Sequence, residues 1–152
     1  MKRDPTATLV NLSKNREENA LKQFSSLLRL CGSEEEKLAL LERYRGEYAA
    51  RLAEQGRQGT SVMALENFKQ FMAHLESAVS QQQDQASRSR DALDNGLALL
   101  RQAQQRSKIF ETLLEKRRGL ARALEGRRQR AQEDEFAARQ FATVSHAGKS
   151  SK

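Results

Sequence analysis

The chain has 152 residues, of which 38% are hydrophobic and 31% charged, and its mean hydropathy is −0.80. So much charge excludes an ordinary globular domain with a thick core and predicts a chain that buries only an apolar stripe. The formal net charge is +7, but Glu and Asp are interspersed with Lys and Arg, so a solvated helical surface explains most of it. Strong helix formers dominate the composition, which predicts an all-α fold.

A first helix is predicted over residues 5–55, because Asp4 can cap it and Pro5 is tolerated at the first helical position. A heptad seam follows, with alternating steps of three and four residues and two charged interruptions. It runs Ala20, Phe24, Leu27, Cys31, Glu34, Leu38, Leu41, Arg45, Tyr48, Leu52. Leu9 and Leu12 are out of step with this seam, so the first two turns are expected to fray or pack differently.

A glycine-rich turn is predicted at 56–60, followed by a second helix over 61–141. Its heptad seam keeps the same steps throughout, which predicts one continuous supercoiling helix. The seam runs Leu65, Phe68, Met72, Leu75, Val79, Gln82, Ala86, Ser89, Leu93, Gly96, Leu100, Ala103, Ser107, Phe110, Leu114, Arg117, Ala121, Leu124. The predicted architecture is a single antiparallel two-helix coiled-coil hairpin over 1–142, with a disordered tail at 143–152.

Two local signals favour a shorter four-helix bundle instead. Gly32–Glu36 contains a capping-box spacing, and Asp94–Gly96 resembles a turn. The heptad phase nevertheless continues through both segments, and an interior glycine costs only about 1 kcal/mol. Two helices with local kinks are therefore the preferred prediction.

The predicted helices differ in length, at about 75 Å and about 120 Å for a rise of 1.5 Å per residue. Counted back from the turn, the first helix ends opposite residue 112. The segment Leu113–Phe141 is then left without a partner in its own chain. Its apolar residues need another molecule to cover them.

No catalytic, cofactor or metal site is predicted. His74 and His146 are the only histidines, and neither has metal-ligand neighbours at a suitable spacing. Nucleophile motifs and phosphate-binding glycine loops are absent. We therefore expect neither an enzyme nor a small-molecule binder.

Cys31 is the only cysteine, which favours a reducing compartment and a packed thiol. The N-terminus has no apolar run that would serve as a signal peptide or a membrane span. A cytoplasmic location is expected.

A basic cluster on the unpaired segment raises nucleic acid as a possible partner. It comprises Lys116, Arg117, Arg118, Arg122, Arg127, Arg128 and Arg130. A basic-region zipper has such a cluster before its heptads, whereas here the cluster ends them and the acidic Glu133–Glu135 follows. No aromatic residues interleave for base stacking. Nucleic acid is not the expected partner.

Near the turn, Phe71 and Ala78 widen the apolar stripe of the second helix to one side of its seam. Together with Leu75 and Gln82 they follow steps of four, three and four residues and so line one face. This face is interpreted either as a partner-binding surface or simply as tighter packing close to the turn.

At these residues the sequence resembles the flagellar FliJ family of the bacterial type III export apparatus. The similar pieces are Tyr44–Tyr48 with Leu52, the glycine-rich turn, Asn67–Val79 and Asp134–Ala137. Their order and spacing agree over nearly the whole chain.

The resemblance implies a non-enzymatic stalk, similar to that of rotary ATPases, at the inner face of the cell membrane. Its implied partners are the hexameric export ATPase, the cytoplasmic domain of the export gate and substrate-specific export chaperones. The gate is expected to contact the face of Phe71, Leu75, Ala78 and Gln82. On the unpaired segment, Leu114, Arg117, Arg118 and Arg122 are the predicted contacts for the ATPase ring. The alternatives are the stalk of a virulence-type secretion system and a self-assembling structural coiled coil.

Overall fold

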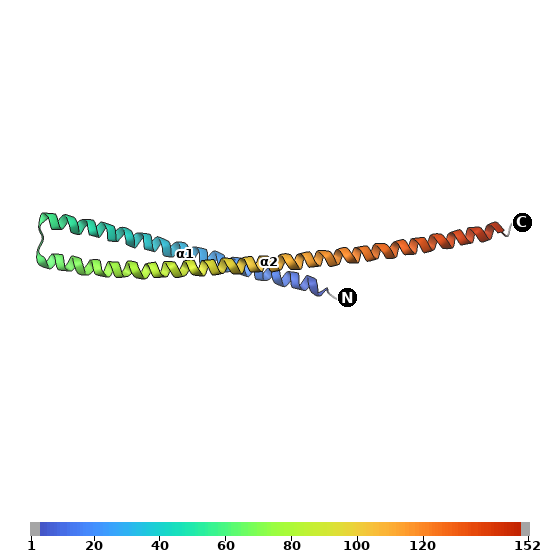
Figure 1. The fold of residues 1–152 in the computed structure, drawn as a ribbon, viewed down its shortest axis with the longest axis horizontal. Helices are drawn as coiled ribbons and strands as arrows, with labels where there is room; N and C mark the ends of the chain where they lie inside the picture. Colours follow the sequence, from blue (N-terminus) through green and yellow to red (C-terminus); the bar gives the residue numbers. More distant parts are fainter. Residues whose placement is uncertain (1–3, 150–152) are drawn as a thin grey trace. The chain divides into compact units, whose positions relative to one another are not determined.

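In the computed structural model, residues 4–149 are described, and they form two long helices without any strand (Figure 1). Helix α1 spans Pro5–Gln58 and helix α2 spans Val62–Lys149. The predicted all-α fold is confirmed. Both helices pass without a break through Gly32–Glu36 and Asp94–Gly96, so the four-helix alternative is wrong.

The N-terminus of α1 has the expected cap. The backbone N–H of Thr6 donates to Asp4 Oδ1 at 3.0 Å, and that of Ala7 donates to the Asp4 carbonyl oxygen at 3.1 Å. These bonds occupy donors that the first turn of a helix otherwise leaves unpaired. The helix is therefore formed from Pro5 onward.

The turn between the helices is shorter than the 56–60 segment predicted from the glycines. Helix α1 continues through Gly56, because only Gly59 has the positive φ, 81°, that reverses the chain at a helix end. Ser61 then caps α2 by accepting a hydrogen bond at 3.2 Å from the backbone N–H of Ala64.

The chain divides into two compact units, which we describe separately. The turn unit comprises residues 14–105, and in it the two helices lie antiparallel on either side of the turn (Figure 1). The terminal unit comprises residues 1–13 and 106–152.

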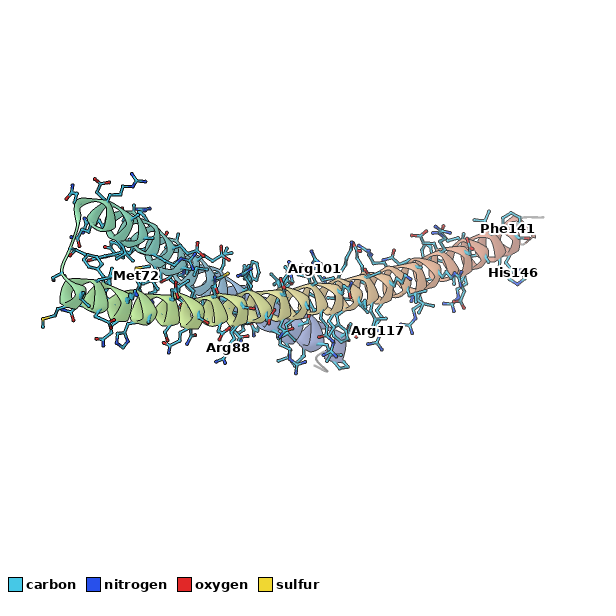
Figure 2. The ribbon with its side chains drawn as sticks, turned by 60° about the vertical axis from the view of Figure 1, so that its left-hand side comes forward. Met72, Arg88, Arg101, Arg117, Phe141 and His146 are labelled. Atoms are coloured by element: carbon cyan, nitrogen blue, oxygen red, sulfur yellow. The ribbon has the colours of Figure 1, made fainter. Side chains whose placement is uncertain are left out.

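Within the turn unit the predicted seams form the core. Every predicted seam residue from Ala20 to Leu52 and from Leu65 to Ala103 is buried or half-buried. Figure 2 shows Met72 among these side chains, on the side of α2 that faces α1. The seam is thin at Gly96, where an added Cβ would come within 2.6 Å of Leu27 Cδ1. The free thiol of Cys31 is buried in the same seam.

In the terminal unit the start of α1 packs against α2, so of the two expectations for its first turns, fraying is wrong and different packing is confirmed. Thr6, Val10 and Ser13 are buried and continue the three-four steps, while Leu9 and Leu12 are exposed. On α2 the buried Ser107 and the half-buried Phe110 and Leu114 carry the seam. The seam is thus built here from small side chains rather than from the leucines.

The unpaired part of α2 begins later than predicted. Arg117 contacts Asp4, so pairing extends five residues beyond residue 112. The reason is that the observed turn, at 59–61, is centred further along the chain than the predicted turn at 56–60. The disordered tail predicted at 143–152 is also wrong as far as Lys149, because α2 continues to that residue and Thr143 Oγ1 donates to the carbonyl oxygen of Arg139. The last three residues of the predicted tail, 150–152, lie outside the described part of the chain.

Candidate functional site

The four residues of the stripe near the turn do not form one open surface. Phe71 has 45% of its surface exposed, whereas Leu75 is buried and Ala78 is half-buried. The ring of Phe71 lies against that of Tyr48, with centroids 4.6 Å apart and planes tilted by 49°. The guanidinium of Arg51 covers the same tyrosine ring at 5.4 Å. Phe71 is thus held in place by an aromatic contact while part of its ring faces solvent.

Gln82 belongs to a polar layer across the seam. Its Nε2 donates to the Glu34 carbonyl oxygen at 3.0 Å and also to the Glu34 carboxylate. On the outer side Lys37 Nζ lies 3.6 Å from that carboxylate. Glu34 and Gln82, two of the polar residues that interrupt the heptad seams, therefore satisfy each other. A signal for this pairing was present in the sequence, because counting back from the predicted turn at 56–60 already places residue 34 opposite residue 82.

In the terminal unit Arg117 closes a clasp on the N-terminus of α1. Its Nη1 lies 3.3 Å from Asp4 Oδ1 and also donates to the Thr6 hydroxyl. The pKa of Asp4 lies below its ordinary value, first because the Thr6 backbone N–H donates to the carboxylate. Bonding by the Thr6 hydroxyl and the charges of Arg117 and Arg118 lower this pKa further, against a partial loss of hydration that raises it.

Beyond this clasp α2 is uncovered in the structure. From Arg118 to Gly148 every residue except the half-buried Gly119 and Gly126 is exposed. Figure 2 shows Phe141 and His146 on this part of the helix, with no other described segment beside them. Its exposed large apolar residues are Leu120, Leu124, Phe136, Phe141 and Val144. We call residues 118–146 the free segment.

A leucine ridge between two rows of cations runs from the last paired turns of α2 into the free segment. At about 100° per residue, Leu113, Leu120 and Leu124 lie within about 40° of one another on the helix. Lys116 and Arg127 flank this ridge on one side, and Arg117 and Arg128 flank it on the other. Acidic residues of this stretch lie away from the ridge.

The predicted contacts for the ring therefore occupy two different environments. Leu114 is half-buried, and Arg117 is engaged by the N-terminus of α1. Arg118 and Arg122 are exposed on the free segment. Leu120, an apolar residue of the unpaired segment that is not among the four predicted contacts, is more exposed than Leu114 and belongs to the leucine ridge.

Within the described residues, no group of three or more His, Cys, Asp or Glu side chains could hold a metal ion. In the same part of the chain, no helix combines the length and the apolar character needed to cross a bilayer.

These features define a class of protein: a long antiparallel helical hairpin in which one helix extends well past the other. The sequence matches the family described as "Flagellar FliJ protein" over residues 1–145. Two curated relatives carry the same description. The relative from Escherichia coli K12 is 31% identical over 88% of this chain and 90% of its own length, and that from Salmonella typhi is 29% identical over 87% and 90%.

The chain therefore belongs to the flagellar FliJ family, and it is a component of the flagellar type III export system. A solved structure described as a YscO homolog from Chlamydia trachomatis covers 98% of this chain and 99% of its own, at 20% identity and a TM-score of 0.48.

Proposed function

We propose that this protein is a non-enzymatic stalk of the flagellar export apparatus, and that its free segment docks in the central opening of the hexameric export ATPase. One observation carries the proposal: α2 continues past its pairing with α1 as a helix whose side chains are exposed. An isolated helix is marginally stable in water, so a helix with exposed leucines and phenylalanines is stabilised when a partner covers it.

The leucine ridge and its cations contribute in different ways. Burial of Leu120 and Leu124 supplies the affinity, because apolar area is removed from water. The exposed Arg118 and Arg122 steer an acidic or polar lining toward the ridge, through interactions that salt screens. Leu114 and Arg117 lie where the covered and uncovered parts of α2 meet, so we place the rim of the ring there.

A second contact involves the export gate, at the inner face of the membrane. In this proposal Phe71 is the residue that inserts into the cytoplasmic domain of the gate, with Ala78 beside it. Leu75 and Gln82 support the surface from below, because one is buried and the other is bonded across the seam. Substrate-specific export chaperones are the third proposed class of partner.

The test is ATPase stimulation by a chain that ends at Arg118. This truncation retains the clasp between Asp4 and Arg117, so the turn unit and the paired part of the terminal unit stay folded while the free segment is lost. We expect stimulation of the export ATPase to be abolished. Stimulation at the full-length level would refute docking through the free segment.

Two full-length variants complete this test. Changing Arg118 and Arg122 together to Gln should slow association with the ATPase and flatten its salt dependence, with less effect on dissociation. Phe71→Ala should weaken binding to the gate domain but leave ATPase stimulation unchanged. It should also lower the melting temperature slightly, since the aromatic contact with Tyr48 contributes about 0.5–1.5 kcal/mol. Loss of both activities in the Phe71 variant would contradict two separate surfaces.

A further inference from the structure

The turn unit has two flanks beside its seam, and one ion pair shows which residues share a flank. Arg90 Nε lies 3.1 Å from Glu35 Oε1, and each residue directly follows a seam residue, Ser89 and Glu34 respectively. Residues that directly follow these seam positions in the two helices therefore lie on one side of the hairpin. A heptad seam alternates two kinds of position, and Glu34 and Ser89 are of the same kind. Residues that directly precede a position of the other kind lie on the other side of the hairpin, because they flank the opposite edge of the seam in each helix.

We call this second side the open face. Its residues next to the seam recur every seven positions, and a further row lies one helical turn away. They include Leu30, Lys37, Tyr44 and Arg51 with Leu40 on α1, and Phe71, Ala78, Ala92 and Leu99 on α2.

Exposed apolar residues are concentrated on the open face. Apart from Val62 and Met63 at the turn, seven large apolar residues of the turn unit are exposed. Five belong to the open face: Leu30, Leu40, Tyr44, Phe71 and Leu99. Only Leu21 and Leu28 belong to the opposite face. The hairpin therefore presents an apolar row that its own seam does not cover.

The two faces also differ in charge. On the open face the cations are Arg16, Lys37, Arg51 and Arg88, and the anions are Glu47 and Glu54. Glu54 is already paired with Arg57 at 3.9 Å, and Lys37 with Glu34 at 3.6 Å. On the opposite face the anions outnumber the cations: Glu18, Glu35, Glu42, Glu66, Glu76 and Asp94 against Lys14, Lys69, Arg90 and Arg101. An apolar row with cations along it matches an apolar ridge flanked by carboxylates.

We propose that the open face of the turn unit binds an amphipathic helix of another protein, with an apolar heptad ridge and acidic flanking residues. A helix fits because the row on α2 from Phe71 to Leu99 has a seven-residue repeat, in which only Gln85 is polar, and extends about 42 Å, as a third helix in a coiled coil requires. A second copy of this chain fits less well, since its own open face would bring Lys37, Arg51 and Arg88 against cations of the same kind.

This inference extends beyond the gate contact proposed above. That contact uses Phe71 and Ala78 near the turn, whereas the open face continues to Leu30 and Leu99, far from it. Substitutions at these two leucines therefore test the open face without altering the gate stripe or the free segment.

The probe is a synthetic four-heptad peptide with Leu at its core positions and Glu at the flanking positions, which repels itself at neutral pH. A matched peptide carries Lys at the flanks. Fluorescence anisotropy with the full chain should show binding of the acidic peptide and little binding of the basic one. Equal binding of both peptides, or no binding of the acidic peptide, would overturn the proposal.

The chain offers a matched pair of variants for the same assay. Leu30→Asp with Leu99→Asp changes side chains that are 49% and 57% exposed on the open face, and Leu21→Asp with Leu28→Asp changes side chains that are 51% and 52% exposed on the opposite face. The first pair should weaken binding about tenfold or more, as loss of central apolar contacts does, and the second less than about twofold. Circular dichroism should report the same helicity for both.

Equal losses of peptide affinity in the two variants would show that the peptide does not bind specifically to the open face. Sedimentation of the full chain tests whether a second copy of the chain occupies the open face. A dimer that the open-face variant dissociates would mean that a second copy occupies this face, and it would overturn the assignment to a different protein.

Discussion

The polar layer of Glu34 and Gln82 leads to a prediction about stability. It tests whether each polar residue is tolerated in the seam because it is hydrogen-bonded to the other. Gln82→Leu removes a donor to a carboxylate whose side chain is only 15% exposed. A hydrogen bond to a charged group contributes about 1.5–3 kcal/mol, so this variant should be destabilised by about that amount. For a chain of this size, 1 kcal/mol corresponds to about 2–4 °C, which gives a fall in melting temperature of about 3–12 °C.

The reciprocal change, Glu34→Leu, should cost about 0.5–1.5 kcal/mol, because the amide of Gln82 loses the carboxylate but keeps the backbone carbonyl oxygen of residue 34 as an acceptor. The double variant should lie close to the native stability or above it, since two leucines fill the seam and no polar group is left unpaired. The measurement is a double-mutant cycle from urea unfolding followed by circular dichroism. Costs that add in the double variant would refute the view that each residue is tolerated because of the other.

Three further outcomes are expected. Because the folded pKa of Asp4 lies below its ordinary value, the ionised clasp stabilises the start of α1 above about pH 4, and this stability is lost as the pH falls through the folded pKa. Hydrogen exchange over the first turns should show this loss, and Asp4→Asn should remove the pH dependence. Tyr48→Ala should cost about 1–3 kcal/mol more than Tyr44→Ala in thermal unfolding, since Tyr48 lies on the seam; equal small costs would show that the seam is misplaced. Gly46→Ala should stabilise the chain by about 1 kcal/mol in the same assay, whereas Gly96→Ala should gain less or lose stability through its close neighbour. Identical gains would mean that the seam has room there.

The seam of the turn unit was predictable because its apolar residues recur at steps of three and four. Val79, Ala86 and Leu100 are buried where that spacing places them. The start of α1 was harder, since its seam consists of Thr6 and Ser13 around one valine. Small polar side chains carry no periodic signal, although they fill a narrow space between two helices well.

The candidate site was predictable in part. Exposed cations such as Arg118 and Arg122 follow from the sequence, because counting back from the turn places them beyond the start of the first helix. The engagement of Arg117 by Asp4 depends on where the turn places two residues that are distant in sequence. Gly56 and Gly59 compete as turn signals, and only the conformation of the backbone distinguishes them. A shift of a few residues at the turn changes every pairing across the seam.

The single thiol at Cys31 gives the protein an internal reporter. Its side chain is buried between α1 and α2, so a reagent in solution can modify it only when the surrounding turns separate. The rate of modification then measures how often that part of the seam opens, without any label or substitution. Partners that bind both helices of the hairpin should slow this reaction in proportion to their occupancy. The rate of thiol modification therefore reports partner binding.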